Sequence, residues 1–153
     1  MSAEAAAVPG DPATAVVLDT NIVLDVFVFA DTAAQPVREG LASGRLAWRA
    51  TAPMREELAR VLDYPHLVRR LTHYGLAAQD VLALFDRHAT VVEVPDKAPY
   101  TCKDPDDQKF IDLAAAHRAV LLSKDQAVLC MRRRLLGLGA RTASTLTQAL
   151  ALS

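Results

Sequence analysis

Short apolar runs alternate with longer amphipathic stretches along the chain. The run at residues 15–18 is apolar and rich in valine, which is typical of a buried strand. Similar runs predict further strands over 45–51, 90–94, 119–123 and, more briefly, 139–144. The segments between them have helical periodicity or begin with proline, and they predict helices over 22–30, 35–42, 53–64, 66–74, 77–88, 108–118, 124–137 and 144–152.

This order of elements predicts the fold class. Strands that alternate with helices favour a parallel sheet with helices on both faces. We therefore expect an α/β fold, a three-layer α/β/α sandwich with a central parallel sheet of four to five strands. Residues 1–14 contain Ala, Pro and Gly and predict a flexible leader, whereas residues 15–153 predict one domain. A chain of 153 residues can build such a core without disulfides or structural metal.

Composition narrows the functional classes. The formal net charge of −1 argues against a protein that coats nucleic acid through general basicity, although a local basic patch is compatible with it. No apolar run approaches the roughly 20 residues of a membrane span. The N-terminal segment carries Glu4 and no basic residues, unlike a signal peptide, so a cytoplasmic location is expected. Cys102 and Cys130 have no metal-ligand spacing and are expected to be reduced thiols.

Polar residues interrupt the apolar pattern directly after the first predicted strand. Asp19, Thr20 and Asn21 separate it from the apolar helix 22–30, and Thr20 or Asn21 is expected to cap that helix. Asp125 follows the strand 119–123 in the same manner. Because the carboxyl ends of parallel strands share one edge of a sheet, Asp19 and Asp125 are predicted to lie at the same edge.

Helical phase places a third acid. In the helix 53–64, Glu57 lies three residues after Met54 and four before Val61, so it flanks the apolar stripe. Glu56 falls on the opposite side and is expected to face solvent. The predicted buried stripe consists of Met54, Leu58, Val61 and Leu62.

The same test places a fourth acid in the helix that begins near residue 108. Asp107 lies on the side of the predicted apolar stripe, whereas Asp112 points away and is expected to be solvated. Asp104 and Asp106 precede the helix, where capping is their simplest role, with Asp104 as a possible additional site residue. The stripe is formed by Phe110, Leu113, Ala114 and His117.

Four acids, Asp19, Glu57, Asp107 and Asp125, are thus predicted to converge. Any one of them alone would be more simply a cap or a surface charge. Together their carboxylates repel one another, so they must take up protons or bind a cation. Oxygen ligands favour Mg²⁺ or Mn²⁺, and the four histidines fall on helix faces as packing or surface groups. Such an ion suits phosphodiester hydrolysis, and the pattern leaves open whether one or two ions bind.

These motifs resemble a known family. The segments VVLDTN, EELARVL, DPDDQKFIDLA and VLLSKD, in this order, resemble a PIN-domain ribonuclease over residues 16–150. The segments DPDD and ELARVL are most similar to toxins of type II toxin–antitoxin systems (VapC-like). The resemblance implies Mg²⁺- or Mn²⁺-dependent hydrolysis of RNA that leaves a 5′-phosphate and a 3′-hydroxyl. It assigns the metal and catalytic roles to the four acids, and the orientation of ligands or water to Thr20, Asn21 and Ser123.

The resemblance also implies partners. The chain has serine at 123, where threonine is common before the last acid, and Lys124 could meet a phosphate. A small antitoxin is expected to pack beside the site, against the helices 22–30, 35–42 and 53–64, and a homodimer is expected. The candidate contacts to the RNA backbone are Arg49, Lys103, Lys109, Arg132, Arg133 and Arg134.

Three other interpretations compete with this one. A PIN fold without catalysis could act as an RNA- or protein-binding module. An enzyme that forms a phosphoaspartate at Asp19 would leave Glu57 and Asp107 without a role. DNA or a flap structure could be the substrate instead of RNA.

Overall fold

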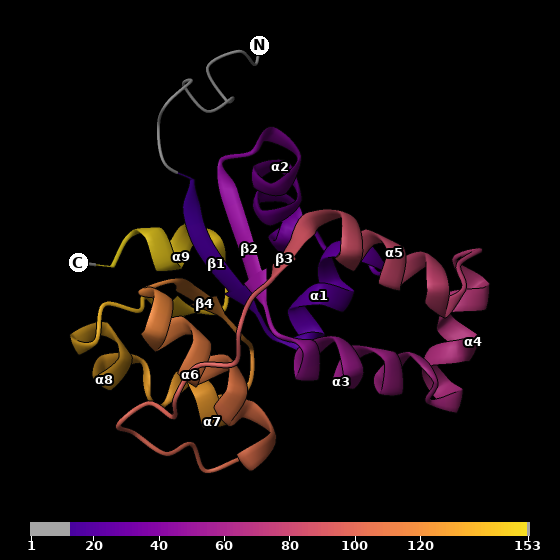
Figure 1. The fold of residues 1–153 in the computed structure, drawn as a ribbon. Coiled ribbons are helices and arrows are strands. Elements are labelled where there is room, and N and C mark those ends of the chain that lie inside the picture. Colours follow the sequence, from indigo (N-terminus) through magenta and orange to yellow (C-terminus); the bar gives the residue numbers. More distant parts are fainter. Residues whose placement is uncertain (1–12, 153) are drawn as a thin grey trace.

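The computed structural model describes residues 13–152. Five parallel strands form its central sheet in the order β3-β2-β1-β4-β5, with helices on both sides (Figure 1). This confirms the predicted α/β/α sandwich. The predicted leader, residues 1–14, lies almost entirely outside the described residues. The strands are β1 (Thr14–Leu18), β2 (Leu46–Ala50), β3 (Ala89–Val91), β4 (Val120–Leu122) and β5 (Thr142–Ala143).

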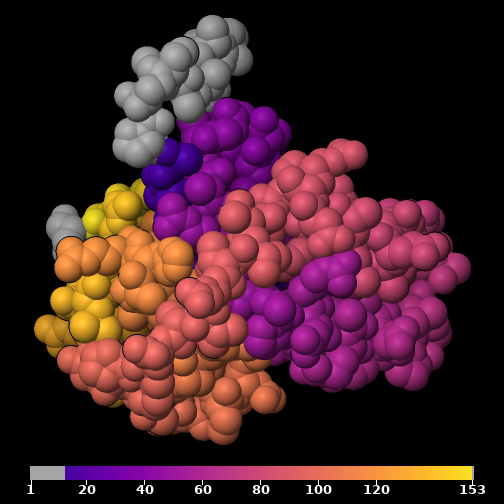
Figure 2. Space-filling view, in the orientation of Figure 1, coloured from indigo at the N-terminus to yellow at the C-terminus, as the bar shows by residue number. Residues whose placement is uncertain are grey.

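Helices α2 and α9 contact each other and the sheet, while α6 packs against β1 and β4. Helices α3, α4 and α5 lie together beside the sheet (Figure 1). In the space-filling view, these three helices form a separate lobe (Figure 2). None of the helices within residues 13–152 is long and apolar enough to cross a membrane. The helices are α1 (Thr20–Phe27), α2 (Gln35–Ser43), α3 (Ala52–Leu62), α4 (Pro65–His73), α5 (Ala78–His88), α6 (Gln108–His117), α7 (Gln126–Leu129), α8 (Arg132–Gly137) and α9 (Leu146–Leu150), and the short 3₁₀ turns are η2 (Thr32–Ala34) and η3 (Pro105–Asp107).

The two central strands carry the most buried residues of the sheet. Val16, Val17 and Leu18 of β1 are at most 2% exposed, and all three residues of β4 are buried. Uninterrupted apolar runs of this kind are expected where helices cover both faces of a parallel sheet. The burial of both strands fixes the positions of the residues that follow them.

The chain reverses its direction across the sheet at β1. It passes from β1 to β2 and β3 on one side, and then crosses back to β4 on the other side of β1. The carboxyl ends of two strands whose connections diverge form a crevice where α/β proteins commonly bind ligands. Asp19 leaves β1 at this point, and its backbone N–H donates to the Leu122 oxygen at the end of β4 (3.1 Å).

Two predictions about the first helix are wrong. Asp19, not Thr20 or Asn21, caps α1, because its extended backbone places its carboxylate against the free N–H groups of the first turn. The helix also ends at Phe27 rather than at residue 30. Ala30 has a φ of 48°, in the left-handed region, which turns the chain towards η2.

Two other boundaries differ from the prediction. The helix predicted over 124–137 is divided into α7 and α8 by a turn in which the Met131 N–H donates to the Val128 oxygen. The strand predicted over 90–94 ends at Val91, because Val91 pairs with Ala50, the last residue of β2. No local residue signals either boundary. The neighbouring elements set them.

Candidate metal centre

Asp19 serves both as a helix cap and as a site residue. Its Oδ1 accepts a hydrogen bond from the Ile22 backbone N–H (2.9 Å), and the residue is only 4% exposed. Burial raises the pKa of Asp19 to about 6, and the negative charge of Asp125 adds to the rise. Hydrogen bonds from Ser123 and Ile22 and the charge of Lys124 oppose it. A nearby cation would therefore help this carboxyl to ionise.

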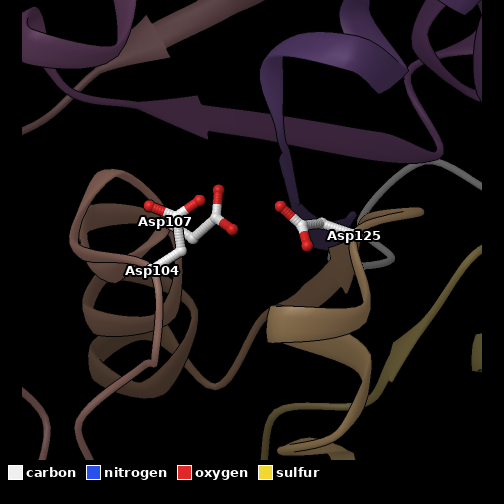
Figure 3. Close-up of side chains that lie close together, drawn as sticks. All are labelled: Asp104, Asp107 and Asp125. Atoms are coloured by element: carbon white, nitrogen blue, oxygen red, sulfur yellow. The ribbon is translucent and has the colours of Figure 1, made fainter.

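Three further aspartates converge opposite Asp19. One carboxylate oxygen from each of Asp104, Asp107 and Asp125 lies within 4.8 Å of the other two (Figure 3). Asp104 precedes the turn η3 and Asp107 is its last residue, while Asp125 caps α7 by accepting from the Ala127 N–H at 2.9 Å. Asp104 also caps η3, as its position predicted. The loop before α6 and the end of β4 thus bring the three carboxylates together.

Asp107 is the most poorly compensated carboxyl of this group. It is 9% exposed, and its Oδ2 is a buried atom without a hydrogen-bond partner among the described residues. Burial, together with the neighbouring Asp125, raises the pKa of Asp107 to about 8. The hydrogen bond between the two carboxyls lowers the pKa of Asp125. Without a cation, the close approach of the two carboxyls therefore favours the protonated form of Asp107.

Glu57 reaches the same pocket from α3. It is half-buried, whereas Glu56 is exposed, as the helical phase predicted. The Thr20 hydroxyl donates to Glu57 Oε2 (2.5 Å), and Lys109 forms an ion pair with Oε1. Glu57 is therefore held by a hydroxyl and a cation of the chain itself, in contrast to Asp107.

These side chains surround one open pocket of about 480 Å³ between α3 and α6. All four predicted acids line it, together with Thr20 and Asn21, two of the three residues expected to orient ligands or water. The third, Ser123, is fully buried behind it and accepts from the Asp125 N–H (3.1 Å). The lining residues are Asp19, Thr20, Asn21, Glu57, Arg60, Val61, Tyr64, Asp106, Asp107, Phe110 and Asp125.

The pocket fits a hard divalent cation. Its donors are carboxylate oxygens without histidine or cysteine among the residues that line it, a set that favours Mg²⁺ or Mn²⁺. The unpartnered Asp107 Oδ2 is a buried acceptor that protein atoms leave unsatisfied. A cation between Asp107 and Asp125 would remove their repulsion. The residues present are thus suited to hold such an ion.

None of the predicted phosphate contacts is among the residues that line the pocket, although Lys109 pairs with Glu57, which does line it. Arg49 Nη1 lies 2.8 Å from His117 Nδ1, at the end of α6 that is remote from Asp107. Lys103 is exposed in the loop before η3, and Lys109 pairs with Glu57. Arg132, Arg133 and Arg134 are exposed on α8, and Arg134 lies over the Tyr100 ring (5.8 Å).

Lys124 is turned away from the pocket. Its Nζ pairs with Asp25 Oδ2 at 2.5 Å. Asp25 is 8% exposed, a buried carboxyl that the sequence analysis did not single out. In this structure Lys124 therefore compensates a buried charge of α1, although its own charge still lowers the pKa of Asp19.

The structure corrects three burial predictions on α3 and α6. Asp112 is not solvated, because its Oδ1 accepts from the Ala98 N–H and from the Gln108 amide, both at 2.8 Å. It thereby ties the loop after β3 to α6. Val61 and His117 are half-buried rather than part of the buried stripe. Val61 faces the pocket, and His117 meets Arg49.

Arg60 and Tyr64 line the pocket but were not predicted as site residues from the sequence. They follow Glu57 by three and seven residues, so the helical spacing that located Glu57 could have located them on the same face. Both are exposed, and Tyr64 is 48% exposed. An arginine and an aromatic ring at the rim of an acidic pocket are suited to contact phosphate and base, respectively.

The two cysteines are free, as expected, with Cys102 buried and Cys130 exposed.

The chain was also compared with known proteins. A family model described as PIN domain matches residues 15–127, which include all four acids of the pocket. No curated protein matches the chain.

Proposed function

Because the chain belongs to the PIN-domain family, whose members are generally nucleases, we propose that it is a metal-dependent endoribonuclease and the toxin of a toxin–antitoxin pair. The observation that carries the nuclease proposal is the convergence of Asp19, Glu57, Asp107 and Asp125 in one pocket, with a buried Asp107 oxygen left unpartnered. The segments DPDD and ELARVL support the toxin role.

In this proposal, Asp107 and Asp125 hold the ion with Asp19, and Asp104 is close enough to contribute. A bound Mg²⁺ or Mn²⁺ supplies Lewis acidity that acidifies water and offsets the charge on the phosphate. The Ser123 hydroxyl accepts from the Asp125 backbone N–H and so orients Asp125, and the Thr20 hydroxyl donates to Glu57 and orients that carboxylate. Arg60 and Tyr64 at the rim would bind the RNA strand that enters the pocket.

An RNA-cleavage assay tests the nuclease proposal. The expected result is cleavage of a labelled single-stranded RNA in Mg²⁺ or Mn²⁺, with 5′-phosphate and 3′-hydroxyl ends, and no cleavage in a chelator. Asp19→Asn should lower the rate on the order of a hundredfold or more, because a neutral amide is a poorer ligand. Asparagine still caps a helix, so the variant should remain folded.

Two results would decide against this proposal. Equal cleavage by wild type and a clean Asp19→Asn preparation would place the activity elsewhere. A folded wild type that binds RNA but cleaves neither RNA nor DNA would indicate a binding module. Cleavage of DNA or a flap structure alone would preserve the chemistry and change the substrate.

The toxin role requires a separate test. Induced expression in a bacterial host should arrest growth, and expression of Asp19→Asn should not. The proposed partners are a small antitoxin and a second copy of the chain, and light scattering on the purified protein would measure the dimer. Growth arrest by the Asp19→Asn variant to the same extent would argue against nuclease toxicity.

A further inference from the structure

A cation of the chain already pairs with one of the carboxylates that line the pocket. Lys109, the second residue of α6, forms an ion pair with Glu57 Oε1. The other Glu57 oxygen accepts from the Thr20 hydroxyl. The two paired side chains are 19% and 23% exposed, so this contact is largely shielded from solvent. Both oxygens of Glu57 are thus engaged by groups of the protein.

Lys109 is held in place by more than its ion pair. Its Nζ also donates to the Asp106 backbone oxygen and lies 5.0 Å from the centre of the Phe110 ring. A backbone carbonyl, a carboxylate and an aromatic face all attract an ammonium group. The ammonium is therefore fixed at the Glu57 side of the pocket, unlike a solvated surface lysine.

The opposite side of the pocket has no such cation. Asp104, Asp107 and Asp125 approach one another within 4.8 Å, and none of them forms an ion pair with a described Lys or Arg residue. The buried Asp107 Oδ2 lacks any partner there. The carboxylates therefore divide into two groups: an unpaired group of aspartates, and Glu57 with its lysine.

We propose that the Lys109 ammonium takes the place of a second metal ion, so that the protein binds one divalent cation per chain, at the aspartate side. In sites with two metal ions, the ions lie about 3.5–4 Å apart and share the charge of the reacting phosphate. Here Lys109 neutralises Glu57 and leaves it without a free oxygen for a second ion. This inference rests on the proposed metal-dependent function and specifies its cation count.

The stoichiometry of Mn²⁺ binding to the full-length chain tests this inference. Calorimetry gives the number of bound ions, and electron paramagnetic resonance distinguishes an isolated Mn²⁺ from a coupled pair. The wild type should bind one ion. Lys109→Gln should bind two, with the first about tenfold tighter, because the pocket loses a positive charge. Lys109→Met serves as a second neutral variant if Lys109→Gln does not fold.

Two controls separate charge from structure. Lys109→Arg retains the charge and should bind one ion, as the wild type does. Arg87→Gln removes one exposed positive charge at the end of α5, away from the pocket, and should also bind one ion. A purely structural role for Lys109 would change the melting temperature without changing the number of ions.

The outcomes distinguish this inference from the proposed function. Two ions in the wild type would overturn the inference and preserve a metal-dependent nuclease. One ion in the wild type and also in both neutral variants would overturn it as well, because Lys109 would then not control the count. No Mn²⁺ binding by the folded wild type would overturn both the inference and the proposed function.

Discussion

Asp25 in α1 and Asp107 before α6 are almost equally buried, at 8% and 9% exposed, but their surroundings differ. Asp25 pairs with the Lys124 ammonium at 2.5 Å. Asp107 lies among the like charges of Asp104 and Asp125, and its Oδ2 has no described partner. One buried carboxyl is compensated within the fold and the other is not.

The difference separates a structural charge from a functional one. A buried carboxylate needs compensation by a cation, hydrogen bonds or a proton. Lys124 provides it for Asp25, so that pair requires nothing from outside the chain. Burial and the neighbouring Asp125 raise the pKa of Asp107, so a metal ion at the site would favour its ionised form. The following predictions test this comparison.

The largest expected effect is that of Asp107→Asn. It should lower the rate of RNA cleavage on the order of a thousandfold and weaken Mn²⁺ binding strongly. The melting temperature should stay the same or rise, because the substitution removes repulsion between carboxylates. Cleavage kinetics, calorimetry and thermal melts measure the three quantities. Asp25→Asn is the matched control, and it should still bind Mn²⁺. If Asp25→Asn lost Mn²⁺ binding and Asp107→Asn retained it, Asp25 would be the functional carboxyl and Asp107 the structural one.

Glu57 tests whether a lysine partner makes a carboxylate merely structural. Glu57→Gln should lower the cleavage rate about a hundredfold, because Glu57 lines the pocket although Lys109 pairs with it. Glu56→Gln, one residue away and exposed, should change the rate less than about twofold. Steady-state cleavage rates of the two variants give the comparison. Equal losses of cleavage rate in the two variants would show that the position of Glu57 in the pocket does not give it a role in cleavage.

Lys124→Met tests the structural half of the comparison. Removing the ammonium leaves Asp25 buried without its cation, so the free energy of unfolding should fall by about 1–2 kcal/mol. The expected loss is moderate because the Lys124 side chain is itself 50% exposed. Urea denaturation measures the change. In the double variant Asp25→Asn, Lys124→Met, most of the loss should be recovered, and an equal or larger loss would contradict the pairing.

The pH dependence of stability tests the comparison without a substitution. The pKa of Asp19 is raised to about 6 and that of Asp107 to about 8, so the folded state binds more protons than the unfolded state from about pH 4 to pH 8. The stability that these groups contribute is present at low pH and is lost as the pH rises through about 6 and 8. In chelator, the melting temperature should fall by roughly ten degrees between pH 5.5 and 8.5.

Metal should reverse this trend, because the ion binds the deprotonated carboxylates. The Mn²⁺ affinity is expected to rise between pH 6 and 8, and the melting temperature at pH 8.5 to recover when Mn²⁺ is added. Asp107→Asn should flatten the upper part of the profile in chelator. A wild-type profile in chelator without any decrease over this range would contradict the raised pKa values.

Much of the fold and part of the site could be predicted from the sequence. The valine-rich run before Asp19 and the run before Asp125 predicted strands of a parallel sheet, and the structure confirms both. Helical phase distinguished Glu57 from Glu56 correctly. It failed for Asp112, because one of the two groups that donate to that carboxylate, the Ala98 N–H, belongs to a loop 14 residues away in sequence. Local spacing identifies the side of a helix, but it does not identify what covers that side.

The sequence by itself determined that acids follow the apolar strands, because strand burial and the parallel order depend on residue types along the chain. Only the tertiary structure decided which charges are paired. Lys124 is next to Asp125 in sequence but pairs with Asp25, and Lys109 of α6 pairs with Glu57 of α3. Ion pairs depend on distances of a few ångströms between distant segments, and these are set by how the elements pack.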